Sequence, residues 1–382
     1  MLALLRRPAL AAVLAALTPA LAAAQAAPEC PVDLYQPSQL AQASVFIQRA
    51  AGAPEGEAGA KALRDAANFL RDERRFATNP VGLAFAKAQI FVLWMHQETP
   101  PTEMTQQELN IGRDRVAKIA LIPAADSLLT IVETAHPGCA TEIDRWRQSR
   151  PWSTRIQAAY RLIGENKVDS AEAMAKEAYV LDRRSPFIYN AFAQIAKARQ
   201  NYDEMFRQLD RAIELASKDT ALVETSMQLR TQYASTMQER AMQETDVAKR
   251  NEMLGRAARL YLAVGAANPA STDGPAYYSA ALDIAMLTQD QTLIGEIINP
   301  LIEDPTPYPD LTLLLGAETM RMVNKQEQAM ALYRGALSKN PNIRDANFFL
   351  TYMLLEAKKP TETTELLDSL MQMDPGNPDN IM

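Results

Sequence analysis

The residue types that most often carry catalysis or bind metals are scarce in this chain. Its 382 residues include only two His and two Cys. His96 and His136 have no second ligand at metal-binding spacing, and no Cys-x-x-Cys pair occurs. The glycine-rich loops that hold phosphates, Gly-x4-Gly-Lys-Ser/Thr and Gly-x-Gly-x-x-Gly, are also missing. We therefore expect a protein that is not an enzyme and that uses neither a metal nor another cofactor.

Two short segments nevertheless combine reactive side chains. In His136-Pro137-Gly138-Cys139 an imidazole stands near a thiol, but a nucleophilic cysteine needs a free thiolate. We interpret this segment as a helix stop, a turn and a structural cysteine.

The second segment, 71–75, reads Arg-Asp-Glu-Arg-Arg. Such a mixed run is typical of a solvated helix face with ion pairs at i,i+3 and i,i+4. Carboxylates are abundant throughout the chain, so a glycosidase-type carboxylate pair is the enzymatic alternative.

The two cysteines are candidates for a disulfide. An oxidising compartment favours pairing of Cys30 with Cys139. The bridge would close a loop of about 110 residues and contribute up to about 4–5 kcal/mol in the chain-entropy account. The alternative is two unpaired buried thiols.

The segment 1–27 has the pattern of a secretory signal peptide. Arg6 and Arg7 form a positive segment, residues 9–17 are apolar, and small residues at 22–26 offer cleavage sites. The alternative is an uncleaved anchor, but the apolar core is short for a membrane span. No second apolar run approaches spanning length. We expect cleavage and an exported chain, periplasmic or secreted, without a transmembrane span.

Charge restricts the partners of the exported chain. Without the two signal arginines, 37 basic residues face 46 acidic ones, and the net charge changes from −7 to −9. This balance argues against nucleic acid or an anionic membrane as the main partner.

The C-terminal part of the chain repeats itself. Ala178 and Leu181 recur 34 residues further along as Ala212 and Leu215. The same interval relates two sets near the C-terminus: Ala329, Tyr333, Ala336 and Pro341, then Thr363, Leu367, Leu370 and Pro375. Looser copies lie between these two regions. A generic helical bundle with accidental spacing is the alternative.

This pattern resembles the tetratricopeptide repeat family, whose 34-residue unit has the same interval and is a pair of antiparallel helices with small residues where the helices touch. The resemblance covers residues 152–382. It implies contact alanines in the first helices at Ala159, Ala193, Ala281 and Ala317, and in the second helices at Ala171, Ala257 and Ala329. We predict an all-α solenoid in residues 151–382, with longer helices at 220–244 and 247–266.

Residues 28–150 lack a convincing repeat but carry helical patterns. We expect helices at 37–51, 57–76, 80–97, 112–134 and 139–148, with 80–97 buried because its apolar residues recur at helical spacing. The region is interpreted as divergent helical hairpins, and a separate helical cap is the alternative.

The family resemblance also implies a partner site. In that family, partner segments often lie in a concave groove lined by the first helix of each unit. The residues carried over to this groove are Ile156, Tyr160, Asn190, Gln194, Lys197, Tyr278, Leu282, Leu314, Glu318, Arg321, Phe348 and Tyr352. Asn190, Gln194 and Lys197 share one helical face, where amides can bond a peptide backbone and the ammonium can meet a carboxylate. The alternative is ordinary exposed helix surface.

Together these features predict an exported scaffold or adaptor that binds a protein or peptide partner in the cell envelope. One alternative is an envelope-polymer binding or processing protein with a carboxylate site in the N-terminal region. Another is a structural subunit that assembles with copies of itself. The sequence does not define the oligomeric state.

Overall fold

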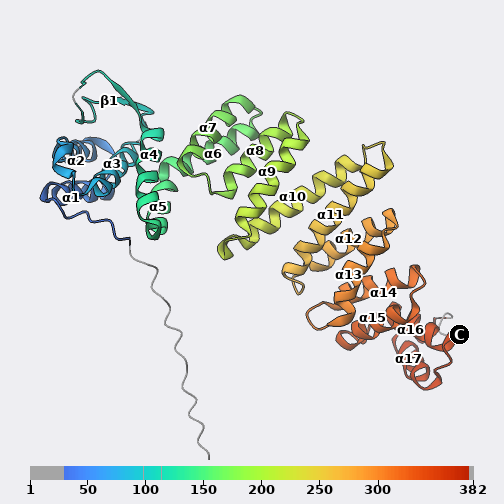
Figure 1. The fold of residues 1–382 in the computed structure, drawn as a ribbon. Coiled ribbons are helices and arrows are strands. Elements are labelled where there is room, and N and C mark those ends of the chain that lie inside the picture. Colours follow the sequence, from blue (N-terminus) through green and yellow to red (C-terminus); the bar gives the residue numbers. More distant parts are fainter. Residues whose placement is uncertain (1–29, 98, 113, 378–382) are drawn as a thin grey trace, which may run out of the picture. The chain divides into compact units, whose positions relative to one another are not determined.

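The computed structural model describes residues 30–97, 99–112 and 114–377, and is helical almost throughout (Figure 1). The predicted signal segment lies outside the described residues. The chain divides into two compact units, residues 1–151 and 152–382, and each is described by itself. None of the helices in the described part combines the length and apolar character needed to cross a membrane.

The N-terminal unit consists of short helices around one apolar helix. Its helices are α1 (Ser38–Gly52), α2 (Gly56–Phe69), α3 (Pro80–Trp94), α4 (Leu121–Ala135) and α5 (Ala140–Arg147). Asn79 caps α3 by accepting a hydrogen bond from the Gly82 amide at 2.9 Å. Eleven of the 15 residues of α3 are buried, because α1 and α4 both pack on it. The expectation of a buried helix here is confirmed.

Two other predicted helices of this unit are wrong in extent. The helix expected at 57–76 ends at Phe69, and a 3-10 turn, η1 (Glu73–Phe76), follows it. The helix expected at 112–134 begins only at Leu121. Residues before it form β2 (Lys118–Ala120), which pairs antiparallel with β1 (Glu103–Thr105). Helical periodicity does not reveal such a pairing, because it depends on two segments that a long loop separates in the sequence.

A disulfide joins the start of this unit to its end. Cys30 is bonded to Cys139, which closes η2 (Pro137–Cys139), across a sequence separation of 109 residues. Cys139 is fully buried in an apolar cluster with Leu129, Val132 and Ile143. Because its sulfur is bonded, this cysteine cannot serve as a thiolate nucleophile.

The C-terminal unit is a series of six helical hairpins. Their helices are α6 (Arg150–Gly164) with α7 (Val168–Leu181), α8 (Pro186–Ala198) with α9 (Tyr202–Ala216), α10 (Val223–Ala241) with α11 (Val247–Ala267), α12 (Gly274–Thr288) with α13 (Gln291–Glu303), α14 (Asp310–Met322) with α15 (Gln326–Lys339), and α16 (Arg344–Glu356) with α17 (Pro360–Met373). A 3-10 turn, η3 (Thr220–Leu222), precedes α10. The longest helices are α10 and α11, with 19 and 21 residues. The predicted all-α solenoid and its longer central hairpin are confirmed.

Small side chains lie where neighbouring helices touch. The predicted contact alanines are all fully buried, namely Ala159, Ala171, Ala193, Ala257, Ala281, Ala317 and Ala329. A methyl side chain lets two helix backbones approach closely, and stacking of successive hairpins then buries a continuous core.

The hairpins also share the way in which their first helix ends. A left-handed residue, with φ between 53° and 59°, follows five of the six first helices, at Asn166, Gln200, Gln289, Asn324 and Lys358. After α8, the Asn201 amide bonds to the Ala196 carbonyl at 2.9 Å, and the Gln200 amide to the Lys197 carbonyl at 2.9 Å. These two bonds satisfy helix-end carbonyls and reverse the chain. None of the five positions is glycine, the residue that usually marks a left-handed turn in a sequence, so the sequence alone does not predict this turn.

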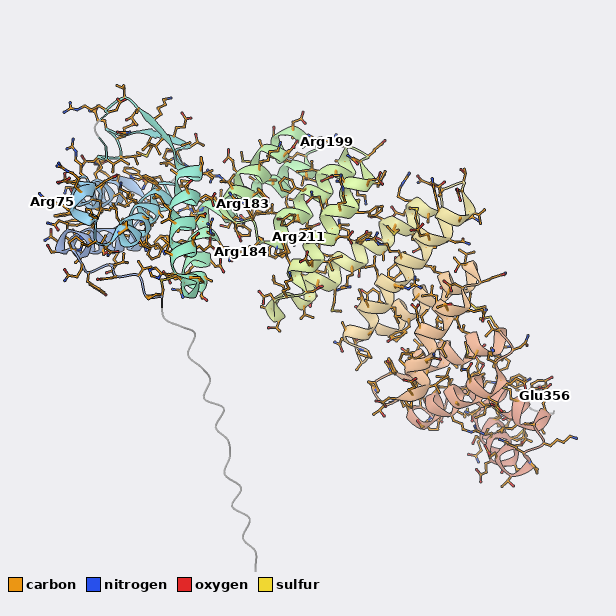
Figure 2. All side chains as sticks on the ribbon, viewed as in Figure 1. Arg75, Arg183, Arg184, Arg199, Arg211 and Glu356 are labelled. Carbon is orange, nitrogen blue, oxygen red and sulfur yellow. A yellow bond between two sulfur atoms is a disulfide. The ribbon has the colours of Figure 1, made fainter. Side chains whose placement is uncertain are left out.

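Ion pairs link consecutive hairpins at the surface. Arg199, which follows α8 and is labelled in Figure 2, bonds to Asp169 and Glu172 of α7, each at 2.7 Å. Further along, Arg334 of α15 pairs with Glu362 of α17 at 2.6 Å. These pairs are exposed, so apolar packing makes the larger contribution to holding the hairpins together.

Candidate functional site

Three of the predicted groove residues are buried in the structure, and the clearest case is Tyr278. It is only 2% exposed and packs edge to face on Tyr308, with 5.7 Å between ring centroids. Burial raises the pKa of its hydroxyl. Ile156 and Leu282 are buried as well. Position in the repeat does not guarantee exposure, because α12 is packed between α11 and α14.

The predicted residues of α6 and α8 are partly engaged in contacts between helices. The Tyr160 hydroxyl donates to the Phe187 carbonyl at 2.7 Å, and burial raises the pKa of Tyr160 to about 12. Lys197 Nζ donates to Thr236 Oγ1 of α10 at 3.4 Å. Gln194 is half-buried, and Asn190 Oδ1 is buried without a hydrogen-bond partner. This group offers one unpaired amide oxygen and one exposed cation.

A more extensively hydrogen-bonded group of side chains lies where α14, α15 and α16 meet. Glu318 accepts hydrogen bonds from Arg321 Nη2 and from the Tyr333 hydroxyl, both at 2.6 Å. The Arg321 guanidinium stacks over the Phe349 ring, 4.1 Å from its centroid. The hydrogen bond to Glu318 raises the pKa of Arg321, and burial raises the pKa of Tyr333. Glu318 and Phe349 therefore hold one cation in a fixed position.

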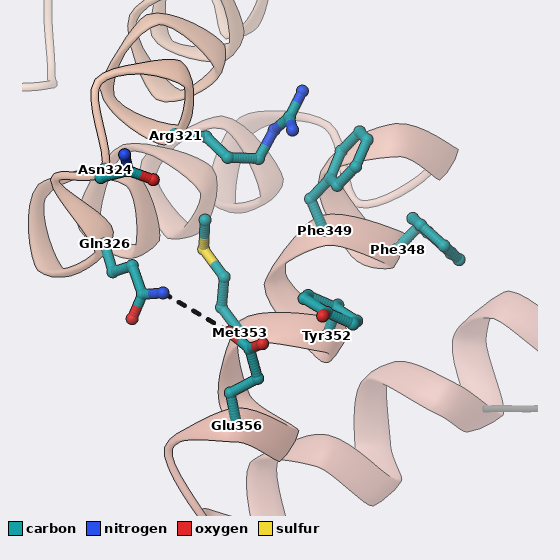
Figure 3. Close-up of a pocket in the computed structure, with 8 residues that line it drawn as sticks. All are labelled: Arg321, Asn324, Gln326, Phe348, Phe349, Tyr352, Met353 and Glu356. Atoms are coloured by element: carbon teal, nitrogen blue, oxygen red, sulfur yellow. Dashed lines mark hydrogen bonds between the residues drawn. The ribbon is translucent and has the colours of Figure 1, made fainter.

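A pocket of about 410 Å³ opens beside this cation (Figure 3). Its lining is Arg321, Asn324, Gln326, Phe348, Phe349, Tyr352, Met353 and Glu356. We call it the Tyr352 groove. Tyr352 is 50% exposed, and its hydroxyl bonds to Glu356, which raises the pKa of Tyr352. Gln326 also donates to Glu356, at 3.4 Å. Aromatic, amide and charged groups thus face one surface hollow.

Sequence reasoning found Arg321, Phe348 and Tyr352 in this groove but missed its other residues. One signal was present: Phe348, Tyr352 and Glu356 recur at i, i+4 and i+8, which places them on one helical face. Asn324 enters the lining through its left-handed turn between α14 and α15.

A second hollow, of about 510 Å³, lies between α10 and α12. Its lining is mostly polar: Glu224, Met227, Gln228, Thr231, Gln232, Ser235, Asn268, Ser271, Asp273 and Tyr277. None of the predicted groove residues lies there. Within the described ranges, no group of three or more His, Cys, Asp or Glu side chains is arranged to hold a metal ion.

Comparisons with known proteins support no functional transfer. No family profile matches the chain. No curated protein matches it either. Among solved structures, pilF from Pseudomonas aeruginosa is 10% identical, covers 60% of this chain and 95% of its own, and has a TM-score of 0.27. YrrB, described as a TPR protein with an unusual peptide-binding site, is 11% identical, covers 62% and 92%, and has a TM-score of 0.20. The RpL4 assembly chaperone Acl4 is 15% identical, covers 60% and 93%, and also has a TM-score of 0.20.

These scores are too low to carry an argument about function. The class rests on the structure itself, with its paired helices, buried contact alanines and recurrent left-handed turns. By this architecture the C-terminal unit is an α-solenoid of tetratricopeptide-like helical hairpins.

Proposed function

We propose that this protein is a scaffold or adaptor that binds a protein or peptide partner through its C-terminal hairpins. The observation that carries the proposal is the Tyr352 groove, which combines an exposed aromatic ring with fixed polar groups. Tyrosine is enriched at interfaces because it buries a large area while keeping a polar tip. The partner-facing residues would be Tyr160, Asn190, Gln194, Lys197, Glu318, Arg321 and Tyr352.

The groove suits one extended segment of a partner. Phe348 and Tyr352 can cover an apolar side chain, while the amides of Asn324 and Gln326 can bond to a peptide backbone. Arg321 is already neutralised by Glu318, so it contributes a flat surface more than a free charge. Affinity would therefore come chiefly from burial of aromatic surface.

We further propose that the protein acts after export, in the periplasm or outside the cell. Residues 1–27 carry the signal pattern, and the Cys30–Cys139 disulfide is of the kind that persists in oxidising compartments.

The test is site-specific photocrosslinking in intact cells. A photoreactive residue at position 352 should capture one defined partner. The same residue at Tyr35, an exposed tyrosine of the N-terminal unit at 75% exposure, should not capture it. With the purified partner, Phe348→Ala combined with Tyr352→Ala should weaken binding at least about tenfold, a loss of about 1.4 kcal/mol. Tyr35→Ala is the matched control. Equal capture at both positions, or equal affinity of the groove variant, would contradict the proposed groove.

A further inference from the structure

The Arg-Asp-Glu-Arg-Arg segment at 71–75 is not the helix face that the sequence suggested. It covers the two residues 71–72 between α2 and η1 and the first three residues of η1. Asp72 accepts hydrogen bonds from Arg74 Nε at 3.0 Å and from Arg75 Nε at 3.3 Å. Glu73 instead pairs with Lys87 of α3. Both guanidiniums are thus tied through Nε, and both side chains are exposed, so their terminal Nη atoms can meet another partner.

These arginines line a polar hollow of about 500 Å³, which we call the Arg71 pocket. Its lining is Gln39, Asn68, Phe69, Arg71, Asp72, Arg74, Arg75 and Gly112. Gln39 comes from the first turn of α1 and Asn68 from the last turn of α2. Arg75 can be seen at the surface of the N-terminal unit in Figure 2. Segments from well-separated parts of this unit's sequence therefore meet at one site.

The lining of the Arg71 pocket is positively charged, although the chain as a whole is negatively charged. Three arginines and one aspartate give its lining a formal charge of +2, whereas the whole chain carries −7. The hydrogen bond from Arg74 lowers the pKa of Asp72, so this carboxylate stays ionised and holds both guanidiniums in place. Next to the pocket lining, the Phe69 ring stacks on the Phe46 ring, with 5.7 Å between ring centroids. The Arg49 guanidinium carbon lies 5.1 Å from the Phe46 ring centroid.

We propose that the Arg71 pocket binds the phosphate group of a small hydroxyl-bearing ligand, of the sugar-phosphate class. Guanidinium groups match phosphate oxygens in bidentate geometry, and a charge of +2 balances a phosphate dianion. The amides of Gln39 and Asn68 supply donors and acceptors for hydroxyl groups beside the phosphate. This site is separate in sequence and unit from the Tyr352 groove, so either can fail without the other.

The experiment is titration calorimetry of the purified, disulfide-bonded chain with glucose 1-phosphate. The wild type should bind it saturably and should bind unphosphorylated glucose at least tenfold more weakly. Combining Arg71→Gln with Arg74→Gln should weaken glucose 1-phosphate binding at least tenfold. The matched control is Arg145→Gln, which removes an exposed arginine of the same unit that pairs with Glu142. Arg71→Lys keeps the positive charge but cannot form the bidentate hydrogen bonds of a guanidinium, and should weaken glucose 1-phosphate binding by an intermediate amount.

Folding is monitored by circular dichroism, which should not change in these surface variants. A second arm uses phosphatidylglycerol vesicles. Capture by the wild type and not by the double variant would support the same phosphate chemistry with a lipid headgroup as its source. Absence of saturable binding to both probes, or equal binding by the double variant, would overturn the proposal.

Discussion

The two units of this protein are both helical, but the contacts that stabilise each unit internally join residues at different separations in the sequence. In the N-terminal unit, the Cys30–Cys139 disulfide has a sequence separation of 109. Asn79 Nδ2 of the same unit donates to the carbonyls of Asp33 and Gln36, at sequence separations of 46 and 43. In the C-terminal unit, each hairpin packs mainly on its neighbours. The first arrangement makes order depend on a few distant connections, whereas the second distributes it along the chain.

Each unit has a buried arginine in an ion pair, and in the C-terminal unit it is Arg155, which bonds to Glu177 of the same hairpin at 2.7 Å. In the N-terminal unit Arg147, only 6% exposed, bonds to Asp126 at 2.7 Å and to Glu133 at 3.0 Å, which fixes α5 against α4. The ion pairs between hairpins of the C-terminal unit, such as Arg334 with Glu362, are exposed. Losing one partner of a buried pair costs much more than losing one at the surface. We therefore expect damage to spread through the whole N-terminal unit, but to stay local in the C-terminal unit.

The largest effect should follow removal of the disulfide. Changing both Cys30→Ser and Cys139→Ser should destabilise the N-terminal unit by up to about 4–5 kcal/mol, because the closed loop limits its unfolded chain. Hydrogen exchange should rise throughout α1, α3, α4 and α5 and stay unchanged in α8–α17. An equal rise in both units would remove the distinction between them. Chemical reduction of the wild type is the matching treatment.

A cavity in the solenoid should have a smaller and more local effect. Leu313 of α14 is fully buried, so Leu313→Ala should cost about 3 kcal/mol. Hydrogen exchange should rise in α12–α16 and little in α8 and α9. Leu311→Ala, on the same helix at 49% exposure, should stay within about 0.5 kcal/mol. Uniform loss of protection along all hairpins would show that the array unfolds as one unit.

The smallest effect concerns the surface ion pairs between hairpins. Hydrogen bonds from Lys176 first and then Arg199 lower the pKa of Glu172. A lowered pKa means that the pairing stabilises the fold above the carboxyl's ordinary value of 4.5 and that this contribution disappears as the pH falls through the lowered value. Arg199→Ala should raise the Glu172 pKa toward 4.5 in an NMR titration. The accompanying stability loss should be below about 1 kcal/mol.

Lys167→Ala, which removes a partner of Glu165 instead, should leave the Glu172 titration unchanged. An unmoved Glu172 pKa in Arg199→Ala would show that this inter-hairpin pair contributes nothing in solution.

Most of the solenoid could be predicted because its signals are local and repeated. Helical spacing, proline at the start of α8 and α17, and alanine at contact positions all act within one hairpin or between neighbours. The β1–β2 pairing and the end of α2 at Phe69 escaped prediction, since they depend on distant packing. Of the residues that line the Tyr352 groove, the repeat pattern points to Arg321, Phe348 and Tyr352 but not to Asn324 or Glu356.

By itself, the sequence determined an all-α chain with a regular helical repeat, and it identified Cys30 and Cys139 as the one candidate disulfide. Tertiary structure alone decided that Tyr278 is buried, that Arg321 stacks on Phe349, and that the arginines at 71–75 line a pocket instead of continuing the face of an α-helix. The physical reason is the separation in sequence over which the deciding interactions act. Helix formation is set by residues three and four apart, whereas exposure and charge grouping depend on which surfaces the folded chain brings together.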